Sequence, residues 1–169
     1  MIVQKMITAI IFILTINSCK VPQAFTSAKK FRGMWKLDKF ETLDAVTSKW
    51  NIDSTRIGYT GYILYDGLGH IAVQQNPPGY KDADVSRNID SMDNRELKKI
   101  ARLYRSNYVY FGGYTIENKT IVHKRLSATN PEDWNTILKR DFKFSGDTLL
   151  LTTQEKVNGS ILRIRWIKF

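Results

Sequence analysis

The chain has 169 residues, of which 43% are hydrophobic and 25% are charged, and these proportions are typical of a single globular domain. Its aromatic content of 12% excludes an extended disordered chain. One cysteine and two histidines exclude an intramolecular disulfide and a Cys/His zinc finger. The common dinucleotide, P-loop, metalloprotease and serine-hydrolase motifs are absent from the sequence.

An apolar run of eleven residues, 6–16, ends shortly before the only cysteine, Cys19. As a helix this run would be about 16 Å long, roughly half the hydrocarbon core of a bilayer. That length fits the apolar region of a signal peptide. Ser18 followed by Cys19 resembles the lipobox of bacterial lipoproteins, whose cysteine becomes the lipid-carrying N-terminus, although Asn17 departs from the usual pattern.

We therefore predict a signal peptide over residues 1–18, lipid attachment at Cys19, a tether over residues 19–30 and one domain over residues 31–169. The mature protein is then expected in the cell envelope, anchored to a bacterial membrane, on the periplasm-facing side of the outer membrane. A plain secretory peptide or an uncleaved anchor are the alternatives. The net charge is +10, but the basic residues are scattered, and export argues against a nucleic-acid partner.

From residue 32 onwards the chain alternates short β-rich runs with turn residues. Asp66-Gly67-Leu68-Gly69 between two such runs is a strong hairpin signal. Eight strands are predicted, over residues 32–41, 56–65, 70–75, 108–116, 120–126, 136–144, 148–153 and 160–169. Because most of them are joined by short turns, the pattern predicts an all-β protein, an eight-stranded up-and-down antiparallel barrel able to hold one small ligand.

One amphipathic helix is predicted over residues 93–104, between the third and fourth of these strands. Its apolar residues share one face, with spacings i, i+3, i+4 and i+7: Leu97, Ile100, Ala101 and Tyr104. Asp93 followed by Glu96 resembles a capping box. We expect the helix to be a lid or plug that packs its apolar face on the barrel, with a membrane-lying helix as the alternative.

An ordered set of motifs across residues 31–169 resembles the lipocalin-like domain family of calycin-type barrels. The motifs are the GxW at 33–35, the hairpin at 61–74, the tyrosine-rich strand at 107–114, the PEDW loop with its following hairpin at 131–153, and the final Trp166-Ile167-Lys168. Two positions depart from the family pattern, Asn135 in place of Gly and Lys168 in place of Arg. The resemblance implies a barrel that binds a small hydrophobic or amphipathic molecule.

The same resemblance implies how one end of the barrel closes. Lipocalins lay a cationic side chain of the last strand over the tryptophan of the GxW motif. Gly33, Trp35, Trp166 and Lys168 are the closure residues here, with Lys168 over Trp35. We expect this group to be structural.

Arg140 is the first candidate ligand-binding residue. In residues 136–144 the even positions are mostly apolar and the odd ones mostly charged, so period two places Arg140 on the inner face. An inward charge is costly unless it is paired or hydrogen-bonded. Two readings stay open: an arginine stacked on Trp134 or on a tyrosine and satisfied by backbone carbonyls, or an anchor for an anionic ligand.

The remaining ligand-binding candidates are His123 and a set of aromatic residues. His123 alternates with Ile121 and Arg125, and the pattern does not say which face of that strand is inward. Aromatic side chains with polar groups suit a partly apolar ligand: Tyr62, Tyr110, Tyr114 and Trp134. No catalytic residue, metal site or cofactor is predicted.

Three functions follow from this reading. We expect a monomeric, non-catalytic carrier of a small hydrophobic or amphipathic molecule, attached to the membrane through its lipid. The alternatives are an isomerase or cyclase that uses the same interior, and an envelope interaction module whose barrel is filled by its own side chains.

Overall fold

The computed structural model describes residues 28–169 apart from 84–87 and 158. The predicted signal peptide, Cys19 and all of the tether before residue 28 lie outside the described residues.

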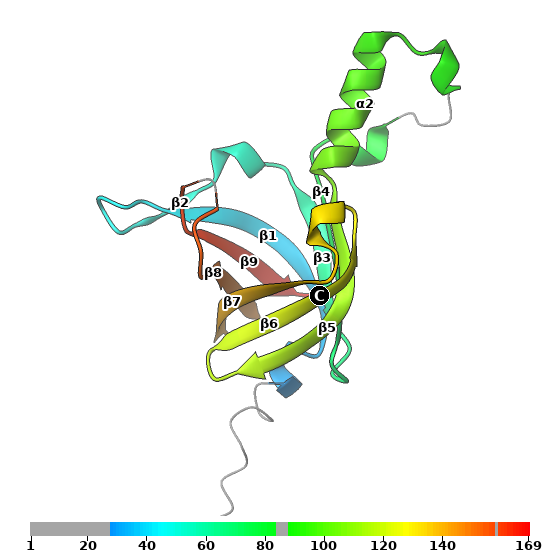
Figure 1. Ribbon diagram of the computed structural model, residues 1–169. Coiled ribbons are helices and arrows are strands. Elements are labelled where there is room, and N and C mark those ends of the chain that lie inside the picture. Colours follow the sequence, from blue (N-terminus) through cyan, green and yellow to red (C-terminus); the bar gives the residue numbers. More distant parts are fainter. Residues whose placement is uncertain (1–27, 84–87, 158) are drawn as a thin grey trace, which may run out of the picture.

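The described chain forms one antiparallel sheet that closes on itself (Figure 1). Its strands are β1 (Gly33–Leu43), β2 (Trp50–Ile52), β3 (Thr60–Tyr65), β4 (His70–Asn76), β5 (Tyr108–Glu117), β6 (Thr120–Ala128), β7 (Thr136–Ser145), β8 (Thr148–Thr153) and β9 (Leu162–Lys168). Helical elements are η1 (Ser54–Arg56), η2 (Tyr80–Asp82), η3 (Ile89–Ser91), α2 (Asn94–Ser106) and η4 (Pro131–Asp133). Each strand from β3 to β8 pairs with the next, and β1 pairs with both β3 and β9.

The predicted eight-stranded up-and-down barrel is therefore confirmed, and β2 is an addition to it. β2 pairs with the last residues of β1 beyond the pairing of β1 with β3, so it extends one strand of the wall. Its three residues, WNI, are too few to show a strand period. With β2 counted, the helix lies between β4 and β5, at the place in the chain where it was expected.

The two ends of the barrel differ. At the closed end the strands are joined by short turns, and a helical turn over residues 28–31 inserts Phe31, which is fully buried. Aromatic rings surround Phe31, with centroids 4.9 Å away in each case: Tyr65, Phe142 and Phe144. At the opposite, open end the connections are longer and carry η1, α2 and η4.

The closure contact expected at the GxW motif is present. The Lys168 ammonium lies 4.2 Å from the centroid of the Trp35 ring and also donates to the carbonyl oxygen of Arg32. Trp35 Nε1 donates to the Phe31 carbonyl at 2.8 Å, and Trp166 is 1% exposed. Gly33 has a φ of +115°, and a Cβ there would lie 2.8 Å from Lys168 Nζ, so glycine leaves room for the lysine.

The structure corrects the expectation that α2 covers the barrel. The helix begins with the predicted capping box between Asp93 and Glu96, but it extends away from the barrel (Figure 1) and has no buried residue. Its apolar side instead contacts the connection before it, where the rings of Tyr80 and Tyr104 are 6.0 Å apart. The inserted segment, residues 77–107, is long enough to supply its own packing partner. Among the described residues, no helix is long and apolar enough to span a membrane.

Candidate functional site

The inner faces of β5, β6 and β7 carry a layer of polar side chains above the aromatic closed end. On β6 the side chains of Ile121, His123 and Arg125 share a buried face. On the opposite face Lys124 and Leu126 are exposed, and Val122 is covered. On β7 the even positions point inward as predicted, and Arg140 is only 8% exposed. The two arginines and the histidine therefore face one interior.

His123 lies fully buried between two tyrosines. Its Nδ1 is 2.8 Å from the Tyr110 hydroxyl and its Nε2 is 3.1 Å from the Tyr65 hydroxyl. Burial lowers the pKa of His123 to about 3, and the charges of Arg140 and Arg125 act in the same direction. The imidazole is thus neutral at pH 7, and a neutral imidazole has one donor and one acceptor nitrogen.

This arrangement fixes what the two phenols do. One phenol donates to the acceptor nitrogen of His123 and the other accepts from its N–H, so the second phenol keeps its own O–H proton for another partner. Burial raises the pKa of both Tyr65 and Tyr110 well above the usual value, so both stay protonated. The cluster offers a hydrogen-bond donor to a ligand rather than a base.

Arg125 is engaged by its neighbours. Its Nη1 lies 2.6 Å from an Asp133 carboxylate oxygen and donates to the Tyr108 hydroxyl at 2.7 Å, while its Nε donates to Thr136 Oγ1 at 2.9 Å. Burial raises the pKa of Tyr108, although the charge of Arg125 opposes this shift. These contacts tie β5, β6, β7 and η4 together at the open end, which is a structural role.

Arg140 is the opposite case. Among the described residues it forms no ion pair, and its Nη1 is buried without a hydrogen-bond partner. The reading in which Arg140 stacks on Trp134 is not supported, because Trp134 is 52% exposed and its Nε1 donates to the Ala128 carbonyl at 2.6 Å. Arg140 is therefore a buried cation, and its Nη1 has no partner among the described residues.

The other predicted residues are divided between the interior and the surface. Tyr110 and Tyr114 face inward, and Tyr114 packs edge-on against Tyr65 with centroids 5.0 Å apart. The expectation that Tyr62 lines the interior is wrong, because Tyr62 is 41% exposed on the outer face and packs on Phe169. Trp134 lies at the end of η4 on the surface.

Sequence reasoning missed Arg125 as a member of this interior group. The one available signal was the alternation of Ile121, His123 and Arg125. Because alternate residues of a strand point to the same face, placing His123 inside also places Arg125 inside. Within the described part of the chain, no three His, Cys, Asp or Glu side chains gather in a group that could hold a metal.

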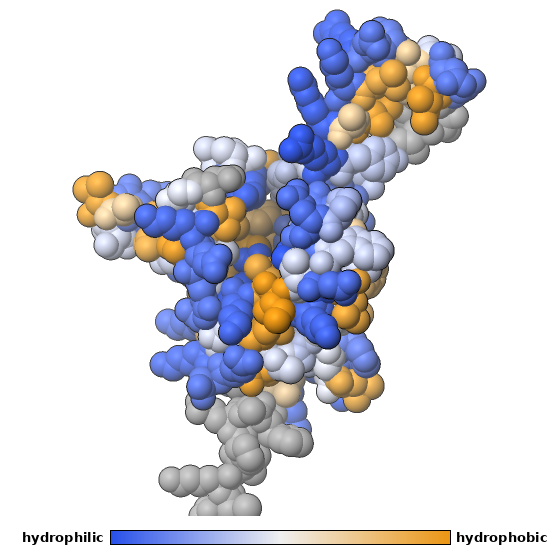
Figure 2. Space-filling view, in the orientation of Figure 1, coloured by the Kyte–Doolittle hydropathy of each residue, from blue (hydrophilic) through white to orange (hydrophobic). Residues whose placement is uncertain are grey.

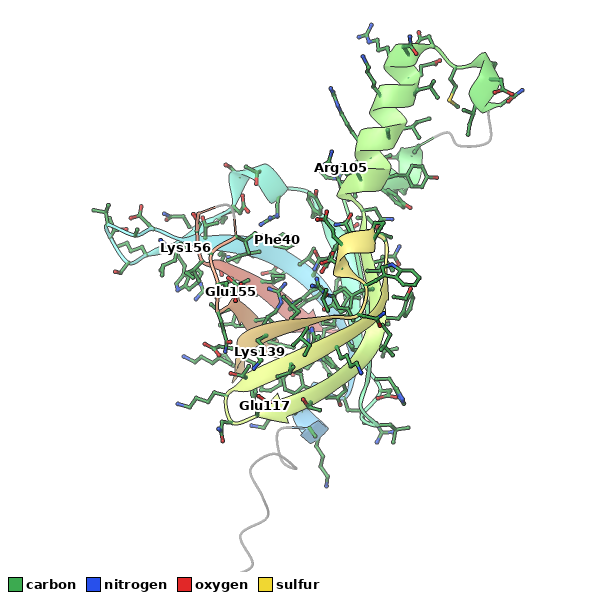
Figure 3. The ribbon with its side chains drawn as sticks, in the orientation of Figure 1. Phe40, Arg105, Glu117, Lys139, Glu155 and Lys156 are labelled. Carbon is green, nitrogen blue, oxygen red and sulfur yellow. The ribbon has the colours of Figure 1, made fainter. Side chains whose placement is uncertain are left out.

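The room for a ligand lies above the aromatic closed end. Figure 2 shows the barrel hollowed towards its open end, with hydrophobic residues recessed in the hollow. Figure 3 shows side chains filling the barrel near its closed end. Phe40 on β1 lies nearer the open end, and Glu117, the last residue of β5, lies at the closed end.

A closed up-and-down antiparallel barrel with this polar inner wall belongs to the class of small-molecule-binding β-barrels. Residues 32–163 match the family model of the lipocalin-like domain, and the chain belongs to that family. Membership of this family supports the binding of a small molecule. No curated protein matches the chain.

Three solved structures are similar to the chain. An uncharacterized protein from Bacteroides eggerthii is 9% identical, with a TM-score of 0.42, over 82% of this chain and 99% of that one. A point mutant of the fluorescent protein UnaG is 10% identical, with a TM-score of 0.40, over 83% of this chain and 97% of that one. Rv2717c from M. tuberculosis is 11% identical, with a TM-score of 0.32, over 87% of this chain and 98% of that one.

Proposed function

We propose that this protein is a carrier of a small amphipathic molecule with an anionic head, and that Arg140 binds the head. The observation that carries this proposal is the buried guanidinium of Arg140 without a counter-ion among the described residues. Desolvating an unpaired charge is costly for folding. A ligand carboxylate would offset that cost, because the planar guanidinium can bond both of its oxygens.

The surroundings of Arg140 favour an amphipath over a simple anion. On the inner face of β7 its neighbours are Leu138 and Phe142, both partly buried against the core. Fatty acids and related carboxylates are therefore the first ligands to test.

The test is binding of a fluorescent fatty-acid probe to the wild-type protein and to Arg140→Met. Methionine keeps much of the side-chain volume and removes the charge, so we expect affinity to fall by about 10- to 100-fold, the equivalent of a lost charged hydrogen bond. Arg163→Met is the matched control, because Arg163 is already paired with Glu41 at 2.7 Å. Equal affinity of wild type and Arg140→Met, or no saturable binding by the wild type, would contradict the proposal.

An isomerase or cyclase built on the same interior is less well supported. Acid–base catalysis needs a group whose pKa lies near the working pH, whereas burial lowers that of His123 to about 3 and raises those of Tyr65 and Tyr110. Both ring nitrogens of His123 already bond to phenols. These features favour binding over proton transfer.

We further propose that the carrier is a lipoprotein of the cell envelope, anchored through Cys19 to the periplasm-facing side of the outer membrane. Ala28, at the closed end of the barrel, follows Cys19 by nine positions. Nine extended residues reach about 30 Å, so a lipid at Cys19 would keep the closed end near the membrane and direct the open end away from it.

Lipid attachment is tested by metabolic labelling with a fatty-acid precursor. We expect label in the wild-type protein and none in Cys19→Ala, because the thiol is the attachment point in the lipobox pattern. Ser18→Ala keeps the thiol and a small preceding residue, and it should still be labelled. An unlabelled wild-type protein recovered in the soluble fraction would refute the anchor.

A further inference from the structure

The wall of the barrel is incomplete beside the first residues of β7. Residues 136–141 of β7 pair with β6, but pairing with β8 begins only at Arg140 opposite Thr153 and runs towards the closed end. β7 has ten residues and β8 has six, so residues 136–139 have no partner strand on the β8 side among the described residues. The segment after β8, residues 154–157, passes beside this free edge.

A groove of about 410 Å³ occupies the gap. It is lined by Ile137, Leu138 and Lys139 of β7, Thr153 of β8, and Gln154, Glu155, Lys156 and Val157. We call this groove the side opening. Ile137 and Lys139 belong to the exposed outer face of β7 whereas Leu138 belongs to the inner face, so the side opening is lined by residues of both faces at this strand edge.

The lining of the side opening includes two neighbours of Arg140. Thr153, which lines the groove, is the cross-strand partner of Arg140. Leu138, which also lines it, precedes Arg140 by two residues on the same inner face. Arg140 is the one charged residue on the inner face of β7.

The outer rim of the side opening is suited to an anionic amphipath. Lys139 and Lys156 are both exposed there, together with one carboxylate, Glu155 (Figure 3). Ile137 adds an apolar surface that is 61% exposed. The rim thus combines a net positive charge with an apolar contact.

The open end is partly filled on one side. Phe40 and Tyr59 pack edge-on there with centroids 5.8 Å apart, and the Arg56 guanidinium lies 5.3 Å from the Phe40 centroid. Phe40 is 4% exposed. This stack fills part of the open end on the β1 side.

We propose that the side opening is the route by which the anionic head of the ligand reaches Arg140. The proposal rests on the carrier function above and adds the path and the rim residues to it. Ile137 controls passage sterically, and Lys139 and Lys156 attract the head from solution. None of these three residues is needed to hold the bound head.

Stopped-flow kinetics of the fluorescent fatty-acid probe separates passage from affinity. Ile137→Trp narrows the side opening without replacing Arg140. The rate constants for association and dissociation should both fall by about 10-fold, because a higher barrier to passage slows the two directions equally. The dissociation constant should therefore be unchanged. Ile57→Trp is the matched control, because Ile57 is an isoleucine of similar exposure, 65%, located at the open end. Its rates should equal those of the wild type.

A charge-reversal pair provides an independent variant. Lys139→Glu with Lys156→Glu should slow association at low salt, and the difference should disappear at high salt, as expected for steering by rim charges. Lys49→Glu with Lys81→Glu makes the same change in net charge elsewhere at the open end and should slow association less. Saturable binding with wild-type rates in both side-opening variants would overturn this route and leave the carrier function standing. Absence of saturable binding by the wild type would overturn both.

Discussion

Replacing Trp35 with alanine should lower the free energy of unfolding by about 3–5 kcal/mol, the usual cost of removing a fully packed tryptophan. The ring is 2% exposed and packs on Phe144 at a centroid distance of 5.8 Å. It also donates to the Phe31 carbonyl and supports the Lys168 ammonium. The substitution therefore opens a cavity at the closed end and frees two neighbours at once.

Urea unfolding of the purified protein measures this effect. Lys168→Ala removes the cation–π contact and the hydrogen bond to the Arg32 carbonyl, and it should cost less, about 0.5–2 kcal/mol. Trp134→Ala removes the same side chain from a site that is 52% exposed, so its cost should be well below that of Trp35→Ala. Equal and small effects for Trp35→Ala and Trp134→Ala would show that the GxW contact does not close the barrel.

Lowering the pH from 7 to 5 should cost about 2 kcal/mol of stability through His123 alone. Burial lowers the pKa of His123 to about 3 from the usual 6.5. Between these values the unfolded chain binds a proton that the folded chain does not, so the free energy of unfolding falls as pH falls below about 6.5. Most carboxylates titrate below this window, which isolates the histidine.

The measurement is the free energy of unfolding by urea at several pH values for the wild type and His123→Gln. Glutamine does not titrate, so the variant should be less stable at pH 7 because a buried network is broken, yet lose little between pH 7 and 5. His70, the second histidine, is exposed beside Asp66, and His70→Gln should retain the steep loss. A steep loss that persists in His123→Gln would contradict a buried neutral imidazole.

Most of the fold could be predicted from local signals. Asp66 to Gly69 marks a hairpin by turn chemistry alone, and strict alternation on β7 places Arg140 inside. The strand β2 and the direction of α2 could not be predicted. Three residues carry no period, and the apolar face of α2 has the same pattern whether it packs on the barrel or on its own preceding connection.

The candidate site was harder to predict because its two arginines look alike in sequence. Arg125 and Arg140 both lie on inward faces, but only Arg125 meets a carboxylate, Asp133, which η4 places above it. A loop contact of this kind has no periodic signal. The prediction that Tyr62 lines the interior was wrong for a related reason. Aromatic and aliphatic residues occur on both faces of β3, and the register with β1 decides which of the two faces points inward.

In the proposed function, Arg140 binds a ligand and is not needed for the stability of the fold. The most direct test of this role is the free energy of unfolding of Arg140→Met without added fatty acid. Because the guanidinium has no partner among the described residues, removal of its charge should leave the protein as stable as the wild type or more stable. A loss of about 3–5 kcal/mol, the cost of breaking a buried charge pair, would show that Arg140 is held by the fold and would contradict the account.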